Sequence, residues 1–127
     1  MGDELRRKMI ESYIGAYNRF DVAAMLANAD PEIIFRNISK GEVNLRTDGI
    51  DEMRKQAEES GASFVGREQV ITCITISEHQ AVVDVQFSGT LAVDLPNGMK
   101  AGDRIALKGK TIFEFRGDKI VGITDIS

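Results

Sequence analysis

Residues 83–93 read Val-Asp-Val-Gln-Phe-Ser-Gly-Thr-Leu-Ala-Val. Apolar and polar side chains alternate along this stretch, which is typical of a β-strand with one face against a hydrophobic core. A second alternating stretch follows at 105–115, and Pro96-Asn97-Gly98 between them is typical of a hairpin loop. Gly117-Asp118 predicts one more turn before a final strand at 120–126. The second half of the chain therefore predicts an antiparallel meander.

The first part of the chain predicts helices instead. Apolar residues recur every four positions in the first helix, which is expected to begin at an Asp3 N-cap: Leu5, Met9, Tyr13 and Tyr17. Asp21 is expected to cap a second, shorter helix that runs to about Asn28 and ends before Pro31.

A third helix and two short strands are expected next. The strands are predicted at 33–38 and 43–46, and the turn Thr47-Asp48-Gly49 is expected to lead into the helix. Gly61 is expected just after the last turn of that helix. Helices that precede a long meander predict an α+β fold, with the helices packed on one face of a curved sheet.

The composition limits what the protein can be. Its 127 residues suit a single domain that spans 1–127, and 43% apolar with 28% charged residues is a globular composition. The net charge of −4 argues against a nucleic-acid partner. No stretch approaches the ~20 apolar residues of a membrane helix, and the charged first residues lack the apolar core of a signal peptide. We therefore expect a cytoplasmic protein with no membrane partner.

Metal and cofactor chemistry is not expected. Cys73 is the only cysteine and His79 the only histidine. Neither an intrachain disulfide nor a His/Cys metal centre is therefore expected. His79 lies in a polar segment between two predicted strands, where a surface turn is expected.

Four segments together carry a resemblance that covers essentially the whole chain. They are the end of the first helix with the Asp that starts the second (13–21), Ala29 to Phe35, Gly49-Ile50, and Phe113 to Ile120. In this order they resemble the nuclear transport factor 2-like superfamily, and within it the SnoaL-like polyketide cyclases and ketosteroid isomerase-like proteins. The resemblance implies a cystatin-like conical α+β barrel. Three N-terminal helices would pack on a strongly curved, mostly antiparallel sheet, with a pocket at the open end. It also implies a homodimer through the convex face of the sheet.

The resemblance also implies positions for catalytic groups. Ketosteroid isomerases use a carboxylate base, a tyrosine and a protonated Asp. These positions fall on Arg36, Tyr13 and Thr111, so two of the three groups are missing. Because Arg stays protonated at neutral pH, it cannot act as the base. Steroid isomerisation by that mechanism is therefore disfavoured.

SnoaL-like cyclases use a single carboxylate near the chain end, and the resemblance places this role on Asp125. Asp125 shares strand parity with Ile123, which suits a core, and Arg36 shares parity with Ile34. We therefore hypothesise that Arg36 and Asp125 form a pair that lines the pocket, beneath Tyr13 and Tyr17. The alternatives are a structural salt bridge, or an Asp125 that faces water. For Tyr17 the alternative is simple core packing.

These expectations define a candidate function. We expect a small organic ligand and acid–base chemistry on it, such as isomerisation, cyclisation or hydration. Asp125 would be the acid or base, Arg36 the electrostatic stabiliser and Tyr13 a hydrogen-bond donor. The remaining ligand-binding residues would be Tyr17, Thr111, Phe113 and Ile123. The alternative is a non-catalytic dimeric module that binds a ligand or a protein. The long hairpin at 94–103 would be a flap over the pocket, a dimer contact, or a hairpin tip without a role.

Overall fold

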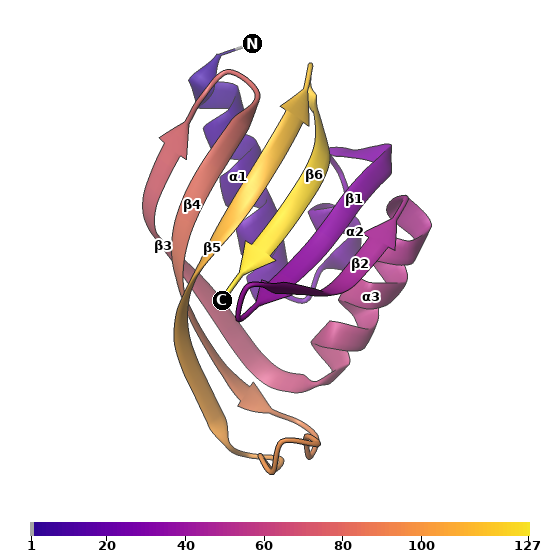
Figure 1. Ribbon diagram of the computed structural model, residues 1–127, viewed down its shortest axis with the longest axis vertical. Helices are drawn as coiled ribbons and strands as arrows, with labels where there is room; N and C mark the ends of the chain where they lie inside the picture. Colours follow the sequence, from indigo (N-terminus) through magenta and orange to yellow (C-terminus); the bar gives the residue numbers. More distant parts are fainter. Residues whose placement is uncertain (1) are drawn as a thin grey trace.

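The computed structural model describes residues 2–127 and shows three helices and one six-stranded sheet (Figure 1). The helices are α1 (Asp3–Asn18), α2 (Val22–Met25) and α3 (Ile50–Ala62). The strands are β1 (Ala29–Ser39), β2 (Glu42–Asp48), β3 (Phe64–Ile76), β4 (Gln80–Leu91), β5 (Arg104–Arg116) and β6 (Lys119–Ile126). The strand order is β2-β1-β6-β5-β4-β3, and all neighbours are antiparallel except β1 and β6. The predicted α+β class is confirmed.

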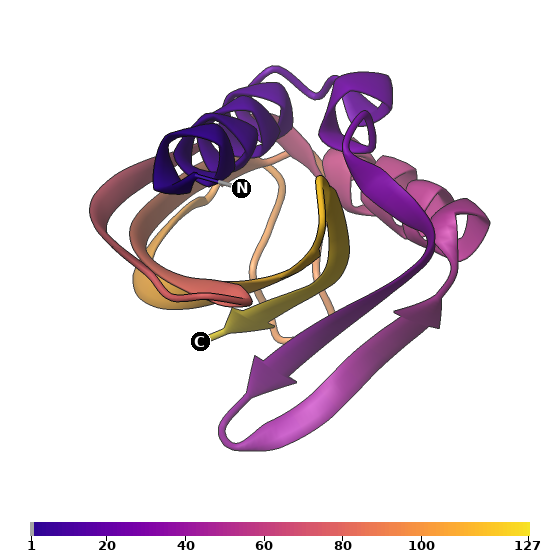
Figure 2. The ribbon, with the colours of Figure 1, turned by 90° about the horizontal axis from the view of Figure 1, so that it is seen from above.

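The sheet is strongly curved, and the helices close its concave side. Figure 2 shows β3 to β6 curling beneath α1, while α2 and α3 lie beside α1 and the β1–β2 hairpin extends away. The core lies between α1 and the inner face of the sheet. It contains Ile10, Val83, Phe113, Ile120 and Ile123, each with at most 1% of its surface exposed. The expected cone of helices on a bent sheet is therefore the observed shape.

The alternation that predicted the meander matches the observed burial. Val83 and Val85 on β4 are buried, and Asp84 between them is only partly buried. On β5 the same period buries Thr111, Phe113 and Phe115. The inner face of each strand thus belongs to the core, because successive side chains point to opposite faces of a strand.

Two helix boundaries differ from the prediction. Asp3 is the first residue of α1 and Gly2 is its N-cap. Gly61 lies inside α3, which continues to Ala62. A Cβ at Gly61 would lie 3.4 Å from the Phe20 ring, so this glycine packs against the segment between α1 and α2 and does not end the helix. The predicted cap at Asp21 is present, since its Oδ1 accepts a hydrogen bond from the Ala24 N–H at 3.1 Å, although α2 ends at Met25.

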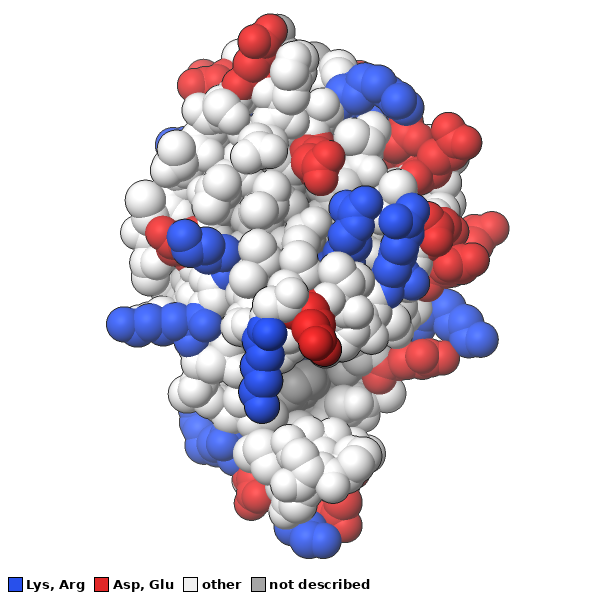
Figure 3. All heavy atoms as spheres, in the orientation of Figure 1, with Lys and Arg blue, Asp and Glu red and all other residues white. Residues whose placement is uncertain are grey.

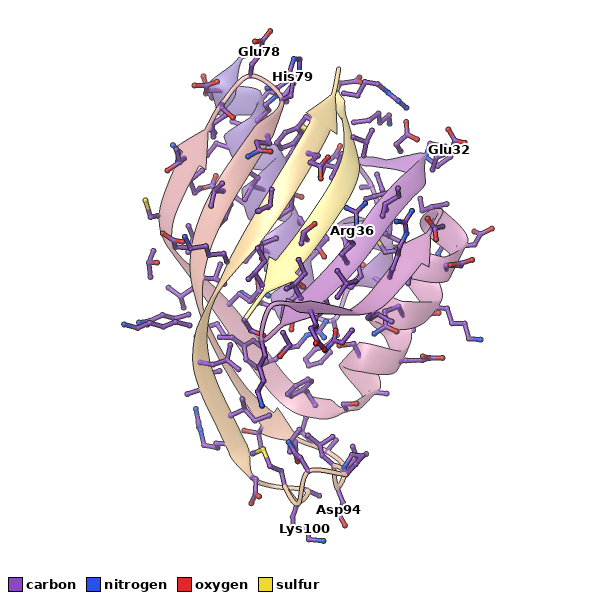
Figure 4. All side chains as sticks on the ribbon, viewed as in Figure 1. Glu32, Arg36, Glu78, His79, Asp94 and Lys100 are labelled. Carbon is purple, nitrogen blue, oxygen red and sulfur yellow. The ribbon has the colours of Figure 1, made fainter. Side chains whose placement is uncertain are left out.

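The loop between β4 and β5 is held by its own hydrogen bonds. Asp94 Oδ1 accepts from the Ala101 N–H at 2.9 Å, and Asp103 Oδ2 accepts from the Lys100 N–H at 3.0 Å. Asp94 and Lys100 lie at one end of the molecule, and Glu78 and His79 lie at the opposite end (Figure 4). None of the residues that line the cavities described below comes from 94–103.

Two further findings concern membrane-spanning helices and metal sites. None of the helices in residues 2–127 is long and apolar enough to cross a membrane. Within the same residues, no group of three His, Cys, Asp or Glu side chains is arranged to hold a metal ion.

Candidate functional site

A cavity of about 290 Å³ lies between the helices and the inner face of the sheet. This volume is close to the lower end of the range for small-molecule sites. Its walls come from α1, α2, α3, β1, β2 and the ends of β3 and β6. The lining residues are Tyr13, Tyr17, Met25, Phe35, Asn37, Leu45, Met53, Gln56, Ala57, Ser60, Phe64 and Asp125.

Asp125 provides the carboxylate of this cavity. Register places it on β6 beside Asn37 of β1 and opposite Thr111 of β5. The Thr111 hydroxyl donates a hydrogen bond to Asp125 Oδ1 at 2.8 Å. Burial raises the pKa of Asp125 from 3.8 to about 6, and the Thr111 hydrogen bond opposes this rise by favouring the charged form. Asp125 can therefore both release and accept a proton near neutral pH.

Tyr13 and Tyr17 present two phenol groups to the same cavity. They are one helical turn apart on α1, so both side chains face the sheet. Burial raises the pKa of both hydroxyls, and the charge of Asp125 raises them further. Both therefore stay protonated at neutral pH and serve as hydrogen-bond donors rather than bases. The Tyr13 ring packs edge-on against Phe113, with centroids 5.4 Å apart.

Arg67 of β3 packs against the Tyr17 ring without lining the cavity, and so fixes the position of Tyr17. Its guanidinium lies 3.7 Å from the centre of the Tyr17 ring and 4.5 Å from that of Phe20. Its Nε donates to the Tyr17 carbonyl at 3.0 Å. Only 7% of its surface is exposed, and burial lowers its pKa. Stacking on two rings offsets part of the cost of burying this cation.

A smaller cavity of about 160 Å³ adjoins the first. Both cavities are lined by Tyr17, Asn37 and Asp125. The smaller one extends towards β4 and β5, where Phe87 and Thr111 belong to its walls. Asp125 is therefore the carboxylate that a ligand in either space would meet.

The predicted pair of Arg36 and Asp125 is wrong. Phe35 and Asn37 line the cavity, so Arg36 between them points to the opposite, outer face of β1. There its register neighbours are Arg46 of β2 and Thr124 of β6. Figure 4 labels Arg36 on β1. The run Ile33-Ile34-Phe35 is apolar on both parities, so it does not reveal which face of the strand is buried.

The other predicted ligand-binding residues divide into two groups. Tyr13 and Tyr17 line the larger cavity, and Thr111 lines the smaller one. Phe113 and Ile123 line neither, because Phe113 is fully buried against Tyr13 and Ile123 is 1% exposed within the core. Phe113 and Ile123 therefore support the cavity wall from within the core and do not contact the cavity as predicted.

Three cavity features were missed from the sequence. Gln56 and Ser60 lie three residues after the apolar Met53 and Ala57 on α3, and this spacing along the helix could have placed them at the cavity. Asn37 would have followed from correct parity on β1. Arg67 carries no local signal, because its burial depends on α1 packing across it.

Comparisons with known proteins agree with this architecture. A family model described as the SnoaL-like domain matches residues 10–123. No curated protein matches the sequence. Among solved structures, a proposed polyketide cyclase from Xanthomonas campestris has 19% identity and a TM-score of 0.84, over 98% of this chain and 90% of that one.

Two further structures share the fold. A proposed SnoaL-like polyketide cyclase from Jannaschia has 14% identity and a TM-score of 0.80, over 96% of this chain and 84% of that one. A protein with a ketosteroid isomerase-like fold from Catenulispora acidiphila, in complex with trimethylamine, has 13% identity and a TM-score of 0.77, over 93% and 83%. Because the family model spans nearly all of the chain and the fold agrees, this chain belongs to the SnoaL-like domain family.

Proposed function

We propose that this protein binds a small organic molecule in the cavity beside Asp125 and transfers a proton to or from it. The observation that carries the proposal is a carboxylate in the cavity wall with a pKa raised to about 6. A group that titrates near working pH is the best suited to acid–base catalysis. The polyketide cyclases of the same fold and the trimethylamine complex support a small-molecule ligand.

The residues around Asp125 suggest how the step proceeds. The charged form of Asp125 removes a proton from a C–H bond next to a carbonyl group of the ligand, and the bonding electrons move to the carbonyl oxygen. Tyr13, which stays protonated, donates a hydrogen bond to that oxygen. Asn37 lies beside Asp125 in the cavity wall, and its Nδ2 donates a hydrogen bond to Asn44 Oδ1 at 2.9 Å. Asp125 then returns the proton to a different atom of the ligand, which would give isomerisation. In a cyclisation, the deprotonated carbon would first bond to a second carbonyl carbon of the ligand, and the proton would go to the oxygen of that carbonyl. Arg36 has no part in this step, since it lies on the outer face.

Deuterium exchange tests the proposal. Cyclohexanone in D₂O exchanges the hydrogens next to its carbonyl when a base removes them, and NMR follows the loss. We expect wild-type protein to accelerate exchange, with a rate that rises through about pH 6 as Asp125 ionises. Asp125→Asn should abolish the acceleration, whereas Asp84→Asn, on the outer face, should retain it. Equal rates for wild type and Asp125→Asn would reject the proposal.

Binding without turnover is the second candidate. Asp125 is the only group in the wall of the larger cavity, apart from the two tyrosines, that carries a titratable proton. Specific binding of a ligand, with no proton exchange at any pH, would favour this role.

The outer face of the sheet is the proposed dimer contact. Exposed Val70 lies there with Glu68 and Lys108, and Figure 3 shows positive and negative side chains interspersed on this face. Sedimentation velocity would test it. We expect a dimer for wild type and a monomer for Val70→Glu, and a wild-type monomer would reject it.

A further inference from the structure

The wall of the larger cavity contains a negative group and no positive one. Asp125 is its carboxylate, and the hydrogen-bond partner of Asp125 is the neutral Thr111. No Lys, Arg or His lines this cavity. Within residues 2–127, Asp125 takes part in none of the ion pairs. A carboxylate removed from water without a cation is costly in its charged form, so a bound cation would stabilise it.

Aromatic rings make up much of the rest of this wall. Four of the eight Phe and Tyr residues of the chain line it: Tyr13, Tyr17, Phe35 and Phe64. The face of an aromatic ring carries partial negative charge, and it attracts organic cations more strongly where water is excluded. The aromatic rings and the Asp125 carboxylate thus both favour a positively charged ligand.

The cations nearest to the cavity lie behind or outside its wall. Arg67 is stacked behind Tyr17 and donates to a backbone carbonyl. Lys110 lines only the smaller cavity, and its Nζ lies 4.0 Å from Asp84 Oδ1 on the outer face. Neither forms an ion pair with Asp125, so the negative charge of Asp125 can pair with a ligand.

We propose that the larger cavity takes an organic cation, an alkylated ammonium group on an apolar body. The charged nitrogen pairs with Asp125, and the alkyl groups contact the aromatic rings. This inference rests on the proposed function in placing the ligand against Asp125, and it adds the chemical class of that ligand.

Cation binding then competes with protonation of Asp125. The polar and charged groups around Asp125 come from several elements: Tyr13 and Tyr17 from α1, Asn37 from β1 and Gln56 and Ser60 from α3 in the larger cavity, Thr111 and Lys110 from β5 in the smaller one, and Arg67 from β3 against Tyr17. Among them only Asp125 changes its charge between about pH 5 and 8, because both tyrosines have raised pKa values and Arg67 stays charged. Cation affinity should therefore fall as the pH drops below about 6, where Asp125 becomes neutral.

Choline and its uncharged analogue provide a matched pair of probes. In dimethylbutanol a quaternary carbon replaces the choline nitrogen, so the two molecules share shape but differ in charge. Isothermal titration calorimetry of the full chain, above pH 7, should give choline an affinity at least about tenfold higher than dimethylbutanol.

Three variants test which residues cause the preference for choline. Asp125→Asn keeps the size of the side chain and removes its charge, so the preference for choline should disappear. Asp84→Asn removes one carboxylate from the outer face and should leave the preference unchanged. Phe35→Leu keeps the wall apolar without the ring and should weaken choline more than dimethylbutanol.

Three results would overturn the proposal. They are equal or tighter binding of dimethylbutanol by wild type, a preference for choline that survives in Asp125→Asn, and no binding of either probe. Cyclohexanone exchange distinguishes this failure from failure of the proposed function. If the hydrogen exchange depends on Asp125 but choline is not preferred, the organic-cation inference is rejected and the proposed proton transfer stands. If choline binds through Asp125 but no hydrogen exchange is accelerated, the proposed proton transfer is rejected and the organic-cation inference stands.

Discussion

Replacing Asp125 by Asn should make the protein more stable at neutral pH. The folded protein raises the pKa of this carboxyl from 3.8 to about 6, chiefly through burial. Its folded form therefore holds the proton more tightly than the unfolded form does. Each tenfold change in an acid dissociation constant corresponds to about 1.4 kcal/mol, so the penalty above pH 6 is about 3 kcal/mol. Because Asp125 is only partly buried, we expect a measured gain of about 1–3 kcal/mol.

The sign of the pH dependence follows from the direction of the pKa change. Below about pH 4 Asp125 is largely protonated in both states, so it contributes little difference in stability. As the pH rises from about 4 to 6, the unfolded chain loses this proton first, and the folded state loses stability relative to it. Asn carries no proton to lose, so the gain from Asp125→Asn should appear across this interval and stay constant above it.

Urea denaturation followed by circular dichroism measures the effect. The free energies of unfolding of wild type and Asp125→Asn should differ by about 1–3 kcal/mol at pH 7.5 and by less than about 1 kcal/mol at pH 4. Asp84→Asn, whose side chain is 45% exposed, is the matched control and should change stability by less than about 1 kcal/mol. A gain of the same size at both pH values, or no gain at neutral pH, would refute the reasoning.

Three further variants test other contacts. Thr111→Val removes the hydroxyl that donates to Asp125, so the pKa of Asp125 should rise above about 6, as measured by ¹³C NMR of the carboxyl carbon. Phe113→Ala should lower the free energy of unfolding by about 3–5 kcal/mol in urea denaturation, because the ring is fully buried. Asp21→Ala removes the side-chain acceptor for the Ala24 N–H and should lower stability by about 0.5–2 kcal/mol, whereas Asp21→Asn should retain most of it.

The strand pattern of the second half could be predicted because each strand there has one buried face. Along most of β4, and on β5 from Thr111 onward, buried side chains alternate with more exposed ones, so parity shows which residues point inward. The family resemblance pointed to Asp125, and its parity with Ile123 predicted that it faces inward; it does line both cavities. Its expected partner was wrong because Ile33, Ile34 and Phe35 are all apolar, and the parity of β1 was taken one residue out of step.

Contacts between distant helices and strands could not be predicted from local sequence patterns. A charged residue on a strand normally predicts a solvent-exposed position, yet Arg67 is buried because the Tyr17 and Phe20 rings cover it. The same limit applies to Gly61, where a glycine near a helix end resembled a termination signal. Its actual environment is the Phe20 ring on a segment forty residues away.

The position of β6 in the sheet has a consequence for how the protein folds during synthesis. β6 is the last of the six strands to leave the ribosome, yet it lies between β1 and β5 at the centre of the sheet. Without β6, both β1 and β5 lack a neighbour that they have in the folded sheet, and unpaired strand edges favour association with other chains. Insertion joins residues about ninety positions apart, such as Asn37 and Asp125, and loop closure of this length is slow. The cavity wall that contains Asp125 is therefore complete only when β6 has paired with β1 and β5, and a chain that stops before β6 would lack both the joined sheet and this carboxylate.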